Sequence, residues 1–420
     1  MDFRNLEQRR KMVLLGGLYI TQFLGLSFIL TAVPAIMRAN GARLDEIGVI
    51  YVLGLVWSIK FLWAPLIDRF GSKRYGHYRI WLIMLQSLLI VLLVAAAFFD
   101  IDSQLNILAI FFALISFASA TQDIAADAIG VNVLSPEERG LGNSIQASGG
   151  FIGNIIGGGL VLIAYSYIGW TASLLVLAAG TALPLINILR YEEQPAPADA
   201  RAEKVGYKDM IRYFRRPGSG RWLLILMTYG LGISTAYAII TPMLVDIGWS
   251  LDQIGFATNI VGSIVSIGGA AVAGWLVHRT GRKMAMILAN ALVGISVVGL
   301  FPVAQGVSST GLIYGAICLM LFAFGANSTM LATIMMDKSD PSTAGTDYTL
   351  QYSMATIFGF ILSGLLLALA ESIQYAGVLW ISIAVVILSL VLVWFYNNFE
   401  PKEFVTYEFP LGDDAPIAAD

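Results

Sequence analysis

The stretch L-I-D-R-F-G-S-K at residues 66–73 has a counterpart, L-V-H-R-T-G-R-K, at residues 276–283, an offset of 210. A second match, at an offset of 205, aligns residues 117–148 with residues 322–353 through a Phe-Ala pair, a proline, a glycine and a Gln-x-Ser triplet. Repeats on this scale indicate two halves of similar fold with equivalent loops on the same side. The chain is therefore predicted to be built from two related units.

The composition around these motifs is that of a membrane protein. Of 420 residues, 57% are hydrophobic and 13% are charged, and the mean hydropathy is +0.76. A soluble protein needs more polar surface than this. The net charge of −3 is spread over short loops and forms no basic face, so no nucleic-acid partner is expected. The single cysteine, Cys318, lies in an apolar run, which predicts neither a disulfide framework nor a metal site.

Twelve stretches of about 20 or more mainly apolar residues are long enough to cross a bilayer. All but three of the 25 Lys and Arg residues lie on the side of the N-terminus, the exceptions being Arg38, Arg43 and Lys60. The positive-inside rule makes that side cytoplasmic, and an even number of spans brings the C-terminus to it as well. The predicted spans are residues 12–37, 45–66, 80–99, 107–131, 144–168, 170–189, 222–245, 254–277, 284–303, 311–336, 348–370 and 375–396.

The longest connection between spans, residues 191–220, divides the chain into two six-helix bundles, residues 1–190 and 221–397. After the last span, residues 398–420 are acidic and contain three prolines, which predicts a cytoplasmic tail without a packed core.

The connection between the bundles contains an amphipathic pattern. Tyr207, Met210, Ile211 and Phe214 follow the i, i+3, i+4, i+7 spacing, with basic residues between them. This pattern predicts a short helix that lies on the inner membrane surface. A flexible linker is the alternative.

The D-R-x-G-x-[KR] pattern of residues 68–73 and its copy resemble the loop between spans two and three of the major facilitator superfamily. The copies depart from that motif at two positions, because His278 replaces its Asp and Ala64 replaces its leading Gly. The resemblance implies an all-α membrane fold of twelve transmembrane helices in two pseudo-symmetric six-helix bundles, with both termini cytoplasmic. It further implies a multi-pass protein of the inner membrane that works as a monomer in the lipid bilayer on a small-molecule substrate.

A narrower resemblance is confined to the first half. Its motifs are G-H-Y-R at residues 76–79, A-T-Q-D-I-A at residues 120–125 and R-G-L-G-N at residues 139–143. They are similar to the branch that holds the muropeptide permease, the acetyl-CoA transporters and the single-protein siderophore permeases of the pyochelin and rhizobactin type, and most similar to the last. This implies import of a ferric siderophore by alternating access, driven by the proton gradient without a cofactor. A permease for muropeptides or other cell-wall fragments, which typically has two further spans, and a small-molecule efflux transporter are the alternatives.

Two carboxylates and one lysine lie deep inside the predicted spans, away from their ends. Asp123 and Asp127 are four residues apart and share one face of a helix. A lipid-facing carboxylate costs roughly 2.5–3.5 kcal/mol on insertion scales, so this face must contact protein or water. Lys60 and Asp123 each lie about 12 Å from the inner end of their helices, which allows them to form a pair.

Asp127 lies one turn nearer the cytoplasm than Asp123. We therefore expect it to meet Arg69, Lys73 or Arg79 in the loop between spans two and three. Two interpretations of the buried charges remain open. They either latch helices together, or Asp123 takes up a proton from outside and releases it when Lys60 or water approaches, which couples import to the proton gradient.

The superfamily resemblance also implies a cytoplasmic gate made by charged loop residues, namely Asp68, Arg69, Arg79, Arg139, Arg279 and Arg282. Polar and aromatic residues near mid-membrane are candidates for substrate contact, and a hydrogen bond between helices is the alternative for each. These candidates are Gln22, Gln122, Gln146, Tyr229, Tyr237, Asn327 and Gln351.

An enzyme is not expected. The only histidines, His77 and His278, lie in predicted cytoplasmic loops, and neither has a nucleophile or metal partner near it in sequence. A receptor that transports nothing is the other alternative. Gradient-dependent accumulation of substrate by vesicles separates these classes.

Overall fold

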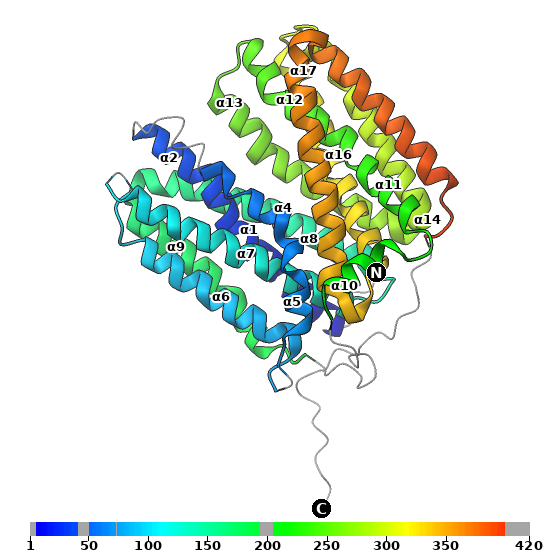
Figure 1. Cartoon of the computed structure of the whole chain (residues 1–420). Helices are drawn as coiled ribbons and strands as arrows, with labels where there is room; N and C mark the ends of the chain where they lie inside the picture. The colour runs from blue at the N-terminus through cyan, green and yellow to red at the C-terminus, as the bar shows by residue number, and fades with distance from the viewer. Residues whose placement is uncertain (1–5, 41–49, 73, 102, 194–204, 400–420) are drawn as a thin grey trace, which may run out of the picture.

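The chain folds almost wholly into helices in a computed structural model that describes residues 6–40, 50–72, 74–101, 103–193 and 205–399. Figure 1 shows these helices gathered into two bundles, one from each half of the chain. The helices of the first half are α1 (Leu6–Ser27), α2 (Val33–Ala39), α4 (Leu55–Ile59), α5 (Ala64–Arg69), α6 (His77–Ala96), α7 (Leu105–Val133), α8 (Arg139–Asn154) and α9 (Val161–Arg190), with shorter turns η1 (Phe28–Ala32), η2 (Lys60–Leu62) and η3 (Ile155–Leu160).

The second half repeats this arrangement after a short connecting helix, α10 (Tyr207–Phe214). Its helices are α11 (Ser219–Tyr229), α12 (Leu231–Asp246), α13 (Leu251–Gly255), α14 (Gly262–Gly299), α15 (Phe301–Ala304), α16 (Thr310–Asp337) and α17 (Ala344–Phe395), with turns η5 (Phe256–Val261) and η6 (Pro341–Thr343). Of the acidic tail predicted from residue 398, residues 400–420 lie outside the described residues, as do residues 194–204 of the connection.

Three long helices contain a residue that breaks the helical path. The breaks are Gly169 in α9 (φ 72°), Gly281 in α14 (φ 76°) and Gln374 in α17 (φ 60°). A positive φ is easy for glycine and costly for other residues. Each break falls between two spans that the sequence predicts. Among the described residues, eight helical stretches are long and apolar enough to cross a membrane, and three of these therefore consist of two consecutive predicted spans.

Prolines explain two irregular turns inside the first bundle. Pro34, at the start of α2, has no N–H to donate, and its ring crowds the carbonyl four residues earlier, so the preceding turn η1 widens to a π-helix. Pro65, at the start of α5, also interrupts the helix before it, but there the preceding turn η2 is a tighter 3₁₀ turn. Lys60 is the first residue of η2 and therefore lies at an interruption of its helix.

The buried apolar residues form three clusters that show how the bundles meet. One cluster combines side chains from both halves, for example Leu15 and Ile124 with Met330 and Tyr348. A second cluster contains only residues of the first half, and a third only residues of the second half. The bundles thus share a core at one end of the molecule and have separate cores at the other, where Figure 1 shows the helices diverging.

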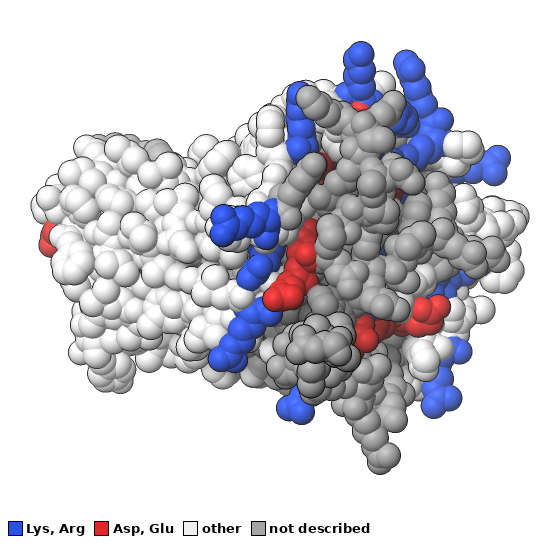
Figure 2. Space-filling view, turned by 90° about the horizontal axis from the view of Figure 1, so that it is seen from below, with Lys and Arg blue, Asp and Glu red and all other residues white. Residues whose placement is uncertain are grey.

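The shared end carries most of the charge. Lys11, near the start of α1, pairs with Glu138 at 3.5 Å, and Lys338, just after α16, donates to the carbonyl of Asn398. Both ends of the described chain therefore lie at this end, and Figure 2, which views it directly, shows Lys and Arg side chains gathered there. We call it the basic end. The positive-inside rule predicts that it faces the cytoplasm.

Two glycines let the bundles approach closely along α8 and α14. A side chain on Gly274 would come within 3.0 Å of the Gly140 carbonyl and of Ser144 Cβ. Further from the basic end, α8 and α14 are joined again by a hydrogen bond of 3.4 Å from Asn154 to Ser263. The α8–α14 contact is thus the seam along which one bundle meets the other.

Candidate functional site

Lys60 is the centre of a buried charged cluster. Its side chain is completely buried, and Nζ forms an ion pair with Asp123 Oδ2 on α7. The ammonium group also lies 5.1 Å from the centroid of Trp57 and 4.5 Å from that of Tyr352. Tyr352 belongs to α17 in the other bundle, so a lysine of the first half is held partly by an aromatic ring of the second.

Asp123 has a second partner within its own bundle. Gln22 on α1 donates from Nε2 to Asp123 Oδ1 at 2.5 Å. Both carboxylate oxygens of this buried residue are thus engaged, one by an amide and one by a cation. The amide oxygen of Gln22 is buried and has no hydrogen-bond partner among the described residues. An acceptor without a partner in such a place is available to a donor from a ligand or water.

Asp127 lies one turn further along α7 and is also buried. Tyr19 on α1 donates to Asp127 Oδ1 at 3.0 Å, and Gln146 Nε2 on α8 donates to the same oxygen at 2.8 Å. Asp127 shares one face of α7 with Asp123, the ion-pair partner of Lys60. The carboxylates and the lysine therefore form one cluster enclosed by α1, α7, α8 and α17.

The expected contact of Asp127 with a loop arginine is wrong. Arg69 is exposed and stacks over Phe70 at 5.5 Å, whereas Arg79 donates to the carbonyls of Ile188 and Leu189 at 3.1 and 2.7 Å. Lys73 lies outside the described residues. The physical reason is depth, because Asp127 lies about 9 Å along α7 from its end, and Tyr19 and Gln146 are nearer.

Two tyrosines of α17 connect the cluster to the second bundle, and neither was predicted from the sequence. Tyr348 donates to Gln146 Oε1 at 3.3 Å, and Gln146 in turn donates to Asp127. Tyr352, one turn later, covers Lys60. The available signal was their spacing of four residues, which places both rings on one face of a helix.

Replacing Tyr352 with leucine should lower the initial rate of substrate transport by on the order of tenfold, since a buried cation–π contact contributes about 2 kcal/mol. Tyr352→Phe keeps the aromatic ring and should transport at nearly the wild-type rate. Uptake by membrane vesicles at equal protein content measures both variants. Equal losses in the two variants would show that the hydroxyl group, not the ring, carries the effect.

A second polar cluster joins the bundles at the basic end. Arg139 at the start of α8 donates from Nη1 to Asp337 Oδ1 at 2.9 Å, and Arg282 donates from Nε to Asp337 Oδ2 at 2.8 Å. Arg282 also donates to the carbonyl of Pro136 at 2.6 Å. Arg139 and Asp337 are both almost fully buried. Charge-assisted bonds of this kind are strong where water is excluded.

Asp68, in the first bundle, makes a second contact between the bundles at the basic end, with the start of α17. Its carboxylate accepts hydrogen bonds from the backbone N–H groups of Gly345 (3.0 Å) and Thr346 (2.7 Å) and from the hydroxyl of Tyr78 (2.7 Å). The N-terminus of a helix offers unpaired N–H groups and a partial positive charge to such an anion. Burial raises the pKa of Asp68 above its usual value, although these hydrogen bonds act in the opposite direction. We call the contacts of Asp68, Arg139, Asp337 and Arg282 the basic-end latch.

The other three arginines predicted for the gate do not join the latch. Arg69 and Arg279 are exposed, and Arg279 stacks over Trp275 of its own helix at 5.9 Å. Arg79 binds carbonyls at the end of α9, within its own bundle. Asp337, which receives both latch arginines, was missed by the sequence reasoning. The signal was a carboxylate directly after a predicted span, facing loops rich in arginine.

Most of the candidate substrate residues form hydrogen bonds within the protein. Gln22 and Gln146 bind the buried carboxylates. Gln122 donates to Gln86 at 2.6 Å, and its own amide oxygen has no partner in the part of the chain that the structure describes. Tyr229 and Asn327 make hydrogen bonds inside the second bundle, to the carbonyls of Met286 (3.0 Å) and Tyr229 (3.4 Å).

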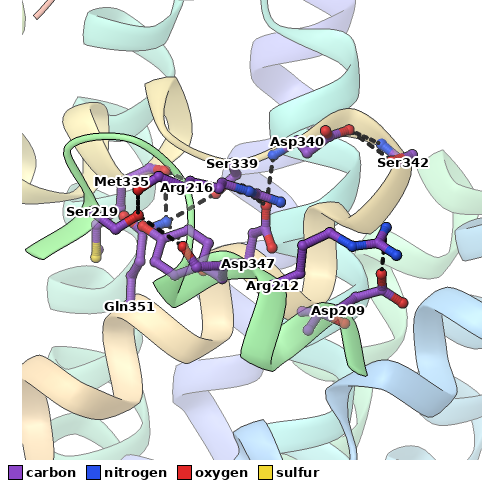
Figure 3. Close-up of polar contacts among 12 residues, drawn as sticks. Asp209, Arg212, Arg216, Ser219, Met335, Ser339, Asp340, Ser342, Asp347 and Gln351 are labelled. Carbon is purple, nitrogen blue, oxygen red and sulfur yellow. Dashed lines mark hydrogen bonds and ion pairs between the residues drawn. The ribbon is translucent and has the colours of Figure 1, made fainter. Parts of the chain in front are cut away.

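Gln351 is occupied by a structural network, as Figure 3 shows. It accepts from Trp222 Nε1 at 2.7 Å and donates to the carbonyl of Met335 and to Ser339. Tyr237 is the one candidate with substantial exposure, 44%, and it stacks against Phe324 with ring centroids 5.9 Å apart. Within the described residues, no group of three or more His, Cys, Asp or Glu side chains is placed to hold a metal ion.

The model of the Major Facilitator Superfamily matches residues 15–354, and the chain belongs to this superfamily. It is therefore a transporter rather than an enzyme, and a multi-pass protein of the inner membrane. The anhydromuropeptide permease of Escherichia coli K12 is 28% identical over 340 residues, which cover 79% of this chain and 69% of the permease. The resemblance to a branch with the muropeptide permease is thus confirmed.

Solved structures agree on the fold. The human organic anion transporter MFSD10 superposes with a TM-score of 0.68 at 15% identity, covering 92% of this chain and 99% of that one. A bacterial homologue of the iron transporter ferroportin, in an outward-facing state with soaked iron, superposes with a TM-score of 0.65 at 17% identity over 92% and 98% of the two chains. At such identities the likeness concerns the fold alone.

Proposed function

We propose that this protein imports a muropeptide or a related cell-wall fragment across the inner membrane by alternating access, driven by the proton gradient. The similarity to the anhydromuropeptide permease carries the choice of substrate. This similarity favours a muropeptide, which the sequence analysis gave as an alternative substrate, over the ferric siderophore. The local motifs at residues 76–79, 120–125 and 139–143 keep the siderophore as the second candidate.

The conformation is consistent with a step that loads substrate from outside. The bundles share a core and a latch at the basic end and have separate cores at the opposite end. With the basic end in the cytoplasm, this is the state closed to the cytoplasm. Two packed bundles that rock about a central site can close one end as they open the other.

The charged cluster offers a route for coupling. A proton that reaches Asp123 from outside neutralises the carboxylate and ends its ion pair with Lys60, which is then attracted by Asp127, the remaining carboxylate of the cluster. Because Lys60 also contacts Tyr352 of α17, a change in its position alters a contact between the bundles. The proton leaves Asp123 for the cytoplasm once the basic end has opened, and the Lys60–Asp123 pair forms again.

The test measures uptake into proteoliposomes that contain the purified full-length chain and carry a proton gradient. Proteoliposomes with the opposite gradient serve as the control. We expect labelled anhydromuropeptide to accumulate when the outside is acidic and to stop accumulating when a protonophore removes the gradient. A labelled ferric siderophore should not accumulate. Accumulation of the siderophore but not of the muropeptide would reverse the order of the two candidates, and gradient-driven expulsion of either would reverse the direction.

A further inference from the structure

Helix α10 presents an apolar face that no described part of the protein covers. Tyr207, Ile211 and Phe214 fall on one side of it, because successive residues of an α-helix advance by about 100°. Their exposed fractions are 54%, 56% and 43%. Tyr213 points elsewhere and is buried against the second bundle. The helix is thus anchored by one side and leaves a second, apolar side open.

A third side of α10 is basic. It carries three exposed basic residues at the helical spacing i, i+4, i+7, namely Lys208, Arg212 and Arg215. Arg212 also pairs with Asp209 of the same helix at 3.1 Å, as Figure 3 shows. An exposed apolar stripe beside a basic stripe matches the surface of an anionic bilayer, where the apolar side chains enter the interface and the cations meet lipid phosphates.

The end of α10 is tied to the start of α17. Arg216, two residues after the helix, donates from Nη1 to Asp347 Oδ2 at 2.5 Å (Figure 3). Asp347 is fully buried, and the same oxygen accepts from the backbone N–H of Asp340 at 2.9 Å. A buried carboxylate of this kind depends on its partner, because loss of the cation leaves an uncompensated charge.

Asp347 directly follows the two residues that hold Asp68. The N–H groups of Gly345 and Thr346 donate to that carboxylate across the contact between the bundles. A continuous chain of bonded groups therefore leads from the surface of α10 through Arg216, Asp347 and the first turn of α17 to the basic-end latch.

We propose that α10 binds anionic membrane lipid at the basic end, and that this contact stabilises the closed latch through Arg216 and Asp347. A membrane suits the helix better than a soluble partner, because α10 ends five positions before Ser219, where a stretch long and apolar enough to span the membrane begins, and so is held at the bilayer surface. Any effect of this lipid contact on transport rests on the proposed function. The lipid contact itself and its effect on the latch do not.

Hydrogen exchange on the full-length chain in lipid nanodiscs tests the proposal. Nanodiscs of phosphatidylcholine alone are compared with nanodiscs that also contain phosphatidylglycerol. We expect the anionic lipid to slow exchange of the amides of α10 and of Gly345 and Thr346 by at least about fivefold, the factor that corresponds to one basic residue at an anionic surface. High salt should remove most of this effect because it screens exposed charges.

Variants separate the steps. Neutralising the basic stripe with Lys208→Gln, Arg212→Gln and Arg215→Gln should abolish both effects of the anionic lipid. Arg216→Gln should abolish the effect on Gly345 and Thr346 while α10 is still slowed. A control that removes three exposed charges elsewhere, at Arg9, Arg74 and Arg190, should behave as wild type.

Equal exchange of α10 in the two lipids, or slowing that survives both salt and the neutralised stripe, would overturn the anionic-lipid contact. Slowing of α10 without any change at Gly345 and Thr346 in the wild type would overturn its link to the latch. Neither readout uses a transported substrate, so failure of the muropeptide proposal leaves these results unchanged.

Discussion

Asp123→Asn should abolish gradient-driven uptake. The substitution removes the group proposed to take the proton and leaves Lys60, which is fully buried, without its ion-pair partner. Breaking a buried pair by removing one partner typically costs about 3–5 kcal/mol. A lower thermal stability of the purified variant is therefore expected beside the loss of uptake.

A second substitution separates coupling from folding. Lys60→Met together with Asp123→Asn removes both charges at similar volume, and replacing a buried pair by apolar or neutral groups is often neutral for stability. The double variant should regain the thermal stability of the wild type but still fail to accumulate substrate against a gradient. Proton-driven accumulation at the wild-type rate in either variant would contradict the role proposed for Asp123.

Asp337→Asn should open the basic end. This carboxylate receives Arg139 and Arg282, so its loss leaves the almost fully buried Arg139 without an anion. The expected cost, again about 3–5 kcal/mol, falls on the state in which the bundles are closed at this end. It is enough to change the ratio of two conformations by more than about 100-fold. Transport should be lost because the cycle stalls with the basic end open.

Cysteine alkylation measures this shift. Ser144 lies in the α8–α14 seam against Gly274 and is 5% exposed. In a Cys318→Ala background, Ser144→Cys should react slowly with maleimide when the latch is intact and much faster with Asp337→Asn. Arg279→Gln removes an exposed arginine outside the latch and serves as the matched control. Slow alkylation in the Asp337 variant would show that the latch does not hold the bundles together.

The sequence alone was sufficient for the class of fold because the signals are local and repeated. Apolar stretches of bilayer length, the copied loop motif and the distribution of Lys and Arg all follow from the requirement that backbone polar groups in lipid be satisfied within helices. The breaks at Gly169, Gly281 and Gln374 fall between predicted spans for the same reason, since each apolar stretch has to end near a membrane surface. The short helix α10 comprises residues Tyr207–Phe214, the same residues whose amphipathic spacing predicted a helix.

The partners of the charged residues could be predicted only in part. Equal depth in two helices suggested that Lys60 could meet Asp123, and the structure contains that ion pair. For Asp127 the same reasoning gave the wrong partner, because Asp127 lies too deep along α7 for the loop arginines to reach it, and helix packing decides which side chains meet it at that depth. Tyr19 and Gln146 reach Asp127 from helices whose relative rotation no local pattern specifies.

The sequence by itself determined that this is a membrane transporter of two repeated bundles with ionisable groups in its interior. Only the tertiary structure decided that Tyr348 and Tyr352 bring those groups into contact with the second bundle, and that Asp337 rather than Arg69 or Arg279 closes the basic end. The physical reason is that these contacts join residues about 200 positions or more apart. Their meeting depends on how one complete bundle docks against the other, and side-chain spacing within a single helix carries no record of it.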